Sequence, residues 1–265
     1  MTEIASTIAA SLPAVILVIV RLGGVAIFAP GLSSPAVPVR VRVGLSILLG
    51  AAIVPVLATR GVADLNGAVE LDIVSLLPFV IMEIALGAVI GFLATLPLAA
   101  AQTGGLLMGQ QMGLGFAQIF NPSLDDESGV LGQLYFLMAL ATFLMMDGLE
   151  HMMLAVMHSF DYVPLGGFSM NGDLVGMLCG LLLASLELAL RIAAPLLALI
   201  FLETVAMSFI ARTVPQLNIL SLGFPIRILA GLAILVVGLA ITHEVLIDGT
   251  GSMLDAIHQW ATTPH

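Results

Sequence analysis

The stretch Gly104–Pro122, GGLLMGQQMGLGFAQIFNP, decides how this chain is interpreted, because it places glycine, glutamine and methionine between two long apolar segments. In hydrocarbon every backbone N–H and C=O group needs an internal partner. Irregular backbone therefore occurs at membrane depth only where protein buries it or where it lines an aqueous cavity. The stretch predicts a re-entrant loop at about residues 104–122 that could act as a gate.

The composition on either side of this stretch is that of a membrane protein. Of the 265 residues, 60% are hydrophobic and only 9% are charged, whereas about a quarter of the residues in a soluble domain are charged. A transmembrane helix needs about 20 mostly apolar residues. By that criterion we predict an all-α, polytopic membrane-inserted protein with six long apolar helices and no separate soluble domain, at about residues 8–30, 41–58, 73–101, 130–158, 174–211 and 226–247.

The charged residues exclude one class of partner. Seventeen acidic residues outnumber seven basic ones, all of them arginine, and the formal net charge is −10. Such a balance argues against nucleic acid as a partner, because nucleic-acid affinity depends on basic patches that neutralise phosphates.

Six ionisable residues lie inside the apolar segments, where each charge costs about 2.5–3.5 kcal/mol on insertion scales. Glu187 and Arg191 are four residues apart, so they can pair on one face of a helix. The other four need a partner on another helix, on another subunit or in water, unless they lie at segment ends and reach the interface. These four are Arg21, Glu83, Asp147 and Glu203.

Small residues and methionines recur at helical spacing. Glycines four residues apart build a flat strip on a helix that lets another backbone approach closely, and they predict a tightly packed assembly: Gly87 and Gly91; Gly105, Gly109 and Gly113; Gly176 and Gly180. Met108 and Met112 lie between the glycines of the second strip. Methionine is unbranched and deformable, so these two side chains either close a constriction or are ordinary packing residues.

Signatures of enzymes and of bound metals are mostly missing from the sequence. His243 and Glu244 begin a string like the HExxH zinc motif, but Ile247 stands where the second histidine would be. Asp147 and His151 have a spacing that could hold a metal, yet the methionines near them are scattered round the helix instead of converging. We therefore expect no metal, no cofactor and no enzymatic activity.

Several short motifs, taken in their order along nearly the whole chain, resemble the FliR family of flagellar export-gate subunits, whose injectisome homologues are called SctT. They are Arg21-Leu-Gly-Gly with Pro30 after it, Pro38-Val-Arg40, Glu83 with Gly87 and Gly91, Gly109-Gln-Gln-Met-Gly113 followed by Asn121-Pro122, Asp147-Gly148, Ser159 with Pro164 and Gly166, Ala194-Pro195, and Arg212-Thr-Val-Pro215-Gln216-Leu-Asn218.

The resemblance implies a subunit of a closed channel in the bacterial inner membrane, at the flagellar basal body, through which unfolded export substrates pass. It implies several copies each of the partners FliP and FliQ, and contacts with FlhB and FlhA. It also implies a FliP-like helical part over residues 1–173 that includes the plug loop, a FliQ-like helical hairpin over 174–247 and a C-terminal tail over 248–265.

The resemblance also assigns residues. The family's plug matches about residues 106–120, which makes the candidates for closing the pore Leu106, Met108, Gln110, Gln111, Met112, Leu114, Phe116 and Phe120. The turn that would contact FlhB contains Arg212, Pro215, Gln216 and Asn218.

Other functions remain open at this point. A secondary transporter would use broken helices near Gly104–Pro122 and acids such as Glu83 and Asp147 for coupling, although the chain does not show the two matching halves that carriers usually have. A structural scaffold and the equivalent subunit of a virulence injectisome are the remaining alternatives.

Overall fold

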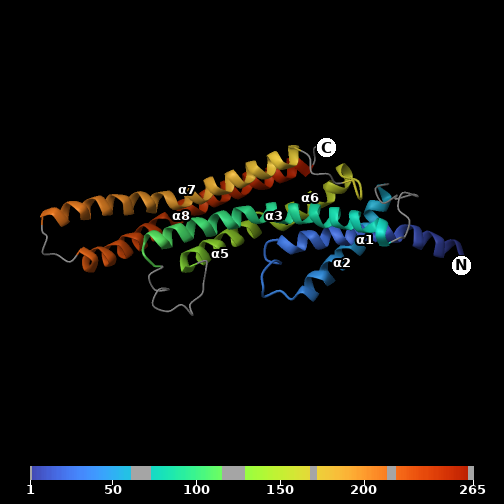
Figure 1. Ribbon diagram of the computed structural model, residues 1–265, viewed down its shortest axis with the longest axis horizontal. Coiled ribbons are helices and arrows are strands. Elements are labelled where there is room, and N and C mark those ends of the chain that lie inside the picture. The colour runs from blue at the N-terminus through green and yellow to red at the C-terminus, as the bar shows by residue number, and fades with distance from the viewer. Residues whose placement is uncertain (1, 61–72, 115–128, 168–171, 214–218, 262–265) are drawn as a thin grey trace. The chain divides into compact units, whose positions relative to one another are not determined.

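The computed structural model describes residues 2–60, 73–114, 129–167, 172–213 and 219–261, and all regular elements in these ranges are α-helices (Figure 1). In chain order they are α1 (Thr2–Phe28), α2 (Val39–Thr59), α3 (Ile73–Gln111), α5 (Gly129–Met145), α6 (Gly148–Tyr162), α7 (Gly172–Thr213) and α8 (Ile219–Ala261). The predicted all-α class is therefore confirmed.

Within the described residues, four helices are long and apolar enough to cross a membrane: Val39–Thr59, Leu76–Gln111, Leu174–Thr213 and Gly223–Trp260. The helices α5 and α6 make a fifth span if the two count as one bent segment, and α1 adds a shorter apolar helix, Leu12–Phe28. The predicted number of six long apolar helices is not confirmed. The helix α8 also extends beyond the predicted segment 226–247 and ends at Ala261.

The predicted fourth segment, 130–158, is wrong as a single helix. It is divided into α5 and α6, which are bent by 64° at a break between Met145 and Gly148. Asp147 in this break has φ 53° and ψ 33°, a left-handed conformation. Because left-handed residues cannot continue a right-handed helix, the chain changes direction here.

The beginning of the predicted re-entrant loop is also wrong. Residues Gly104–Gln111 form the last turns of α3 instead of irregular backbone. Glycine lowers helix propensity by about 1 kcal/mol per residue relative to alanine, but packing of Gly105 against the backbone of Leu131 on α5 outweighs that cost.

Contacts divide the chain into two compact units, which are described separately. Unit 1 comprises Met1–Thr95, Asp147–Leu181 and Ser252–His265, and unit 2 comprises Leu96–Met146 and Leu182–Gly251. Both units combine segments that are distant in the sequence. The predicted division at residue 173 rests on the resemblance and stays a prediction.

Each unit has its own apolar core. In unit 1 the core includes Leu17, Leu86 and Ile90, and α1 packs beside α2. In unit 2 it includes Leu98, Phe143 and Leu196. A large part of the apolar surface nevertheless remains uncovered within the chain, since Val236 and Val237 of α8 are 73% and 78% exposed. Exposed apolar side chains over such long helices are what lipid or other subunits would cover.

Candidate functional site

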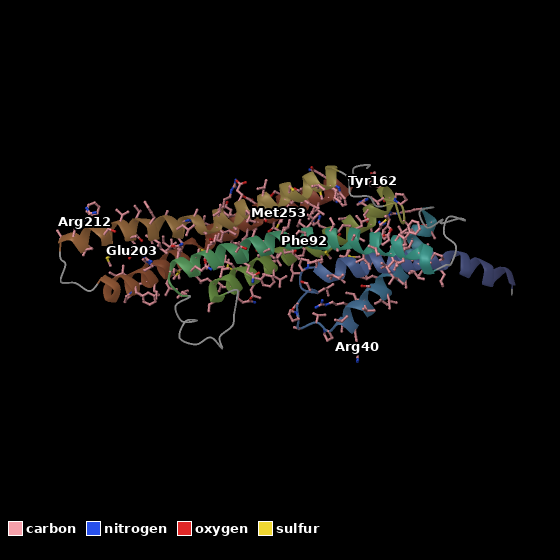
Figure 2. All side chains as sticks on the ribbon, in the orientation of Figure 1. Arg40, Phe92, Tyr162, Glu203, Arg212 and Met253 are labelled. Atoms are coloured by element: carbon pink, nitrogen blue, oxygen red, sulfur yellow. The ribbon has the colours of Figure 1, made fainter. Side chains whose placement is uncertain are left out.

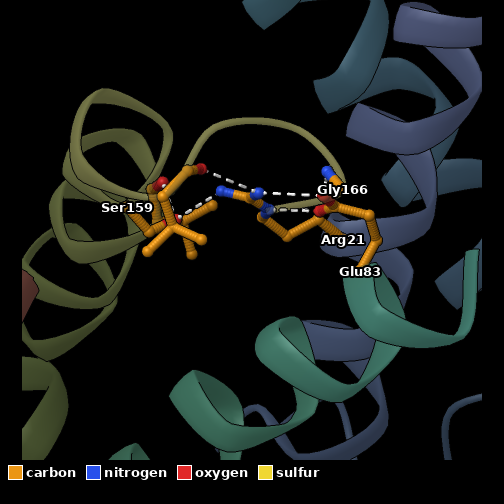
Figure 3. Close-up of polar contacts among 6 residues, drawn as sticks. Arg21, Glu83, Ser159 and Gly166 are labelled. Carbon is orange, nitrogen blue, oxygen red and sulfur yellow. Dashed lines mark hydrogen bonds and ion pairs between the residues drawn. The ribbon is translucent and has the colours of Figure 1, made fainter. Parts of the chain in front are cut away.

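Arg21 and Glu83 form an ion pair in the core of unit 1, and both side chains are completely buried (Figure 3). The guanidinium donates through Nε and Nη2 to the two carboxylate oxygens, the second bond being 3.0 Å long. It also donates to Ser159 Oγ at 3.1 Å and to the carbonyl oxygen of Val163 at 3.2 Å. The Glu83 carboxylate accepts a further bond, 2.8 Å long, from the backbone N–H of Gly166.

These contacts join four parts of unit 1: α1, α3, α6 and the turn that follows α6. The Arg21 guanidinium also lies over the ring of Phe160, 4.0 Å from its centre. Desolvating two charges is expensive, and an ion pair offsets that cost only when its geometry is good and its remaining donors and acceptors are used. Both conditions hold here, so each of these two intramembrane charges has its partner on another helix of the same chain.

The helices α1 and α3 approach each other closely beside this ion pair, because glycines face the opposite backbone. A Cβ atom on Gly87 would overlap the carbonyl oxygen of Arg21, and one on Gly91 would lie 2.5 Å from the carbonyl oxygen of Val25. From the other side, Gly24 faces the backbone of Ile84. The strip of Gly87 and Gly91 therefore lets the two backbones touch, which the spacing of these glycines predicts.

In unit 2, α3 ends in a Schellman motif at the glycine-rich stretch. The N–H of Leu114 donates to the carbonyl of Gly109, and the N–H of Gly113 donates to the carbonyl of Gln110, both at 3.0 Å. Gly113 has φ +80°, a conformation that glycine adopts without strain. The direction of the chain where it leaves the helix is therefore fixed by backbone hydrogen bonds.

The end of α3 and the start of α5 are packed together and form a neck. A Cβ atom on Gly105 would lie 2.5 Å from the carbonyl oxygen of Leu131, and one on Gly132 would lie 3.2 Å from the carbonyl oxygen of Gln102. Leu106 lies close to Gly129, the first residue of α5. The last turns of α3 and the first turn of α5 are therefore held side by side within unit 2.

The candidate plug residues differ in burial. Met108 and Met112 are buried inside unit 2, with exposed fractions of 2% and 0%, whereas Gln110 and Gln111 are exposed. Leu106 and Leu114 are half-buried, and Phe116 and Phe120 lie outside the described residues. Gly109 makes only ordinary contacts with Leu131. The role of these residues in closing a pore stays a prediction.

The hairpin formed by α7 and α8 contains two ion pairs that involve predicted site residues. Arg227 on α8 pairs with Glu203 on α7 at 3.0 Å and donates to Thr204 Oγ1 at the same distance. The Glu203 carboxylate is only 10% exposed. The pair Glu187 and Arg191 forms as its spacing predicts, at 2.7 Å, but both side chains are more than 60% exposed.

The remaining predicted site residues make few contacts or lie outside the described residues. Asp147 is exposed at the break after α5 and makes no capping hydrogen bond with its side chain. Arg212 is exposed in the last turn of α7, the helix that also carries Glu203 (Figure 2). Pro215, Gln216 and Asn218 lie outside the described residues. Gly176 and Gly180 have open space beside them, so this strip packs against no other described part of the chain.

Sequence reasoning missed three residues that complete these contacts. Ser159 and Gly166 entered only as pieces of a motif, and their position beside the Arg21–Glu83 pair depends on the path of the chain after α6. Gly231 of α8 was not singled out, although a Cβ atom there would lie 2.7–2.8 Å from Met112. A single glycine in an apolar helix has no repeat spacing, so nothing in the sequence marks it.

A comparison of the sequence with known protein families identifies the family of this chain. Residues 12–253 match the family model described as "Bacterial export proteins, family 1". The chain belongs to this family. The predicted membership of the FliR family is confirmed, and the apolar helices indicate a membrane-embedded export protein.

Curated relatives agree with the family. The chain is 29% identical over 207 residues to the flagellar biosynthetic protein FliR of Escherichia coli K12, covering 78% of this chain and 77% of the relative. It is 27% identical over 238 residues to FliR of Bacillus subtilis 168, covering 88% and 89%. It is also 30% identical over 161 residues to Yop proteins translocation protein T of Yersinia pestis, covering 60% and 62%.

Proposed function

We propose that this chain is a subunit of the flagellar type III protein export gate, where it forms a closed channel together with FliP and FliQ and contributes the plug that seals the channel. Unfolded flagellar export substrates are the cargo. The subunit has no catalytic activity of its own and lies in the bacterial inner membrane at the flagellar basal body, in contact with FlhB and FlhA.

The observation that carries the proposal is the neck in unit 2. Gly105 on α3 and Leu131 on α5 touch through their backbones, and α3 ends nearby in a motif that fixes the outgoing chain. This contact holds together the end of α3 and the start of α5, the two helices that flank residues 115–128 in the sequence. The location of this neck in an export protein supports the assignment of the adjoining residues as a plug.

The distribution of polar groups supports burial of the chain among other subunits. Glu187 and Arg191 form an exposed pair on a helix of membrane length, next to Leu183, Leu186 and Leu190, which are more than half exposed. Charged groups are costly in the hydrocarbon interior. We therefore infer that this face of α7 is covered by protein or water instead of lipid, as a subunit of a multi-protein channel requires.

The flagellar system is favoured over a virulence injectisome because the similarity to the flagellar relatives extends over a larger share of this chain. The similarity to the two FliR proteins extends over 78% and 88% of the chain, whereas that to the Yop translocation protein extends over 60%. The injectisome subunit is kept as a second candidate, because the identity over that shorter region is 30%.

The gating assignment is tested by replacing residues 115–128 with a Gly/Ser linker of equal length, which leaves the neck and the end of α3 intact. We expect the assembled complex to conduct ions while its subunits still co-purify. A matched control replaces residues 61–72 in the same way and should leave conductance unchanged. Unchanged conductance in the 115–128 variant would contradict the proposed function. A transporter, by contrast, would purify without unlike partners.

A further inference from the structure

Unit 1 contains a second cluster of ionisable groups, at the last turn of α6. Asp161 Oδ2 lies 3.2 Å from Arg60 Nη1 at the end of α2 and 3.7 Å from Nδ1 of His158, one turn earlier on α6. The ring of His158 also meets the ring of His258 in the last turn of α8, edge to face, with 5.5 Å between the ring centres. The last turn of α6 therefore connects the ends of α2 and α8 within one compact unit.

The end of α8 is attached to unit 1 mainly by apolar side chains. Four of them lie on one face of the helix and are at most 9% exposed: Met253, Leu254, Ile257 and Trp260. His158 is 36% exposed and His258 is half-buried, so water reaches the contact between the two rings. This contact is therefore a polar part of an otherwise apolar attachment, and protons can reach it.

Protonation changes the contact between the two rings in two steps. Histidine is the side chain that ordinarily changes its charge between pH 5 and 8. A first proton on His158 faces the carboxylate of Asp161, and an edge-to-face arrangement with a neutral ring is a favourable one for aromatic groups. A second proton places two positive charges 5.5 Å apart, while Arg60 already shares the carboxylate of Asp161. The second step therefore opposes the contact.

We propose that His158 and His258 form a proton-sensitive contact, which weakens the attachment of the end of α8 to α6 when both rings are charged. The proposal is independent of the role in export. Among the described residues no three side chains converge in a way that could hold a metal ion, so the proton is the ligand that this cluster fits.

The surrounding charges do not cancel this repulsion. Asp255, one turn before His258, is exposed, so water screens its effect. The Arg21–Glu83 pair contacts the neighbouring Ser159 but adds no net charge. On the described elements that meet here, the ionisable side chains are Arg60 at the end of α2, His158, Asp161 and Tyr162 on α6, and Asp255 and His258 on α8.

The size of the effect follows from the separation of the rings. Two charges 5.5 Å apart in a partly exposed place repel enough to change an equilibrium about tenfold, equivalent to about 1.4 kcal/mol. The burial of four large apolar side chains contributes more than this. The end of α8 should therefore open more often at low pH without being released permanently.

The test is amide hydrogen exchange of residues 253–260 in the full-length chain in detergent, at pH 7.5 and pH 5.0. Each rate is divided by the rate of the unfolded sequence at the same pH, which gives a protection factor. We expect protection to decrease about tenfold at pH 5.0. His158→Gln and His258→Gln each remove one of the two charges, and both variants should change less than twofold between the two pH values.

Matched controls remove a histidine elsewhere on the same two helices. His151 on α6 and His243 on α8 are both exposed and lie outside the cluster. His151→Gln and His243→Gln should therefore keep the tenfold decrease. If the wild type shows no decrease, or if either His158→Gln or His258→Gln keeps it in full, the proposal is wrong, because the effect requires both charges.

Two further measurements separate repulsion from a general loss of stability in acid. Asp161→Asn removes the carboxylate that compensates His158, so the decrease at pH 5.0 should become larger than in the wild type. Salt at 1 M reduces the Debye length to about 3 Å, so it should restore protection at pH 5.0 more in the wild type than in His258→Gln. A smaller decrease in Asp161→Asn, or equal restoration by salt in both proteins, would overturn the proposal.

Discussion

Arg21 and Glu83, 62 residues apart in the chain, are each other's counter-ion in the core of unit 1, and neither side chain has any exposed surface. Glu83 accepts a third bond from the backbone N–H of Gly166, and Arg21 donates also to Ser159. A change at either member of the pair therefore removes several hydrogen bonds at once and leaves the other member buried without its counter-charge.

We expect Glu83→Gln to lower the free energy of unfolding by about 3–5 kcal/mol, the usual cost of leaving one charge of a buried pair alone. The measurement is thermal denaturation of the purified full-length chain in detergent. The matched control is Glu187→Gln, which breaks an exposed pair on α7. Exposed pairs on a helix contribute about 0.5 kcal/mol or less, so equal shifts in Tm for the two variants would contradict this account.

Two adjacent glycines of α1 provide the second prediction. A Cβ atom on Gly24 would overlap the carbonyl oxygen of Ile84, while nothing lies within 4 Å of Gly23. Gly24→Ala should therefore separate α1 from α3 and destabilise the chain by about 1–3 kcal/mol, as overpacking does. Gly23→Ala should be neutral or stabilising, because alanine favours helix. Thermal denaturation of both variants checks the prediction, and a stable Gly24→Ala variant would argue against the close helix contact.

The sequence allowed the all-α class and the approximate positions of most helices to be predicted, because long apolar runs of membrane length have few other solutions. It did not allow the break in the fourth segment to be predicted. The polar residues Asp147, Glu150 and His151 lie in this segment, but the left-handed conformation of one residue is a local property that hydropathy does not report.

The candidate site was predictable only in part. The short-range pair Glu187–Arg191 follows from helical spacing alone. Glu83 could be recognised as a residue in need of a partner, but the identity of that partner depends on which helices pack together. At the end of α3 the two sequence signals disagree. The glycine content predicts irregular backbone, whereas the glycine spacing predicts a helical strip, and Gly105 is helical and packs directly on the backbone of Leu131.

The break at Asp147 predicts that the same substitution by glycine changes stability in opposite directions at positions 145 and 147. Because Asp147 has φ 53° and its side chain is exposed, Asp147→Gly should be neutral or stabilising. Met145 is 77% exposed in the last turn of α5, so Met145→Gly should destabilise the helix by up to about 1 kcal/mol.

Substitution by valine tests the same break, because valine disfavours the left-handed conformation that glycine accepts. Asp147→Val should destabilise by about 1–3 kcal/mol, since a branched residue is strained in the left-handed region, and Met145→Val should have a smaller effect. The denaturation midpoints of the four variants, measured in the same detergent, check this prediction. If glycine lowers stability at both positions by the same amount, the chain is helical through residue 147.

The hairpin of α7 and α8 has its own ion pair. Reversing both charges shows whether the specific contact stabilises the hairpin, or whether any change of charge at these positions destabilises it. Arg227 pairs with Glu203, whose carboxylate is 10% exposed, and donates a further bond to Thr204. Glu203→Arg alone places two arginines together and should destabilise the hairpin. Adding Arg227→Glu restores opposite charges at the same two positions and should recover a large part of the loss, with a coupling of about 1.5–3 kcal/mol for a hydrogen bond between charged groups.

Amide hydrogen exchange in the described part of the hairpin, residues 200–213 and 219–235, measures this coupling where it acts. The matched exchange, Glu187→Arg with Arg191→Glu, involves an exposed pair within α7 and should show a coupling several times smaller. Of these two ion pairs, only Glu203–Arg227 joins different helices, so protection should decrease in both helices of the single variant Glu203→Arg. Loss of protection in α7 alone would mean that the pair does not join the two helices.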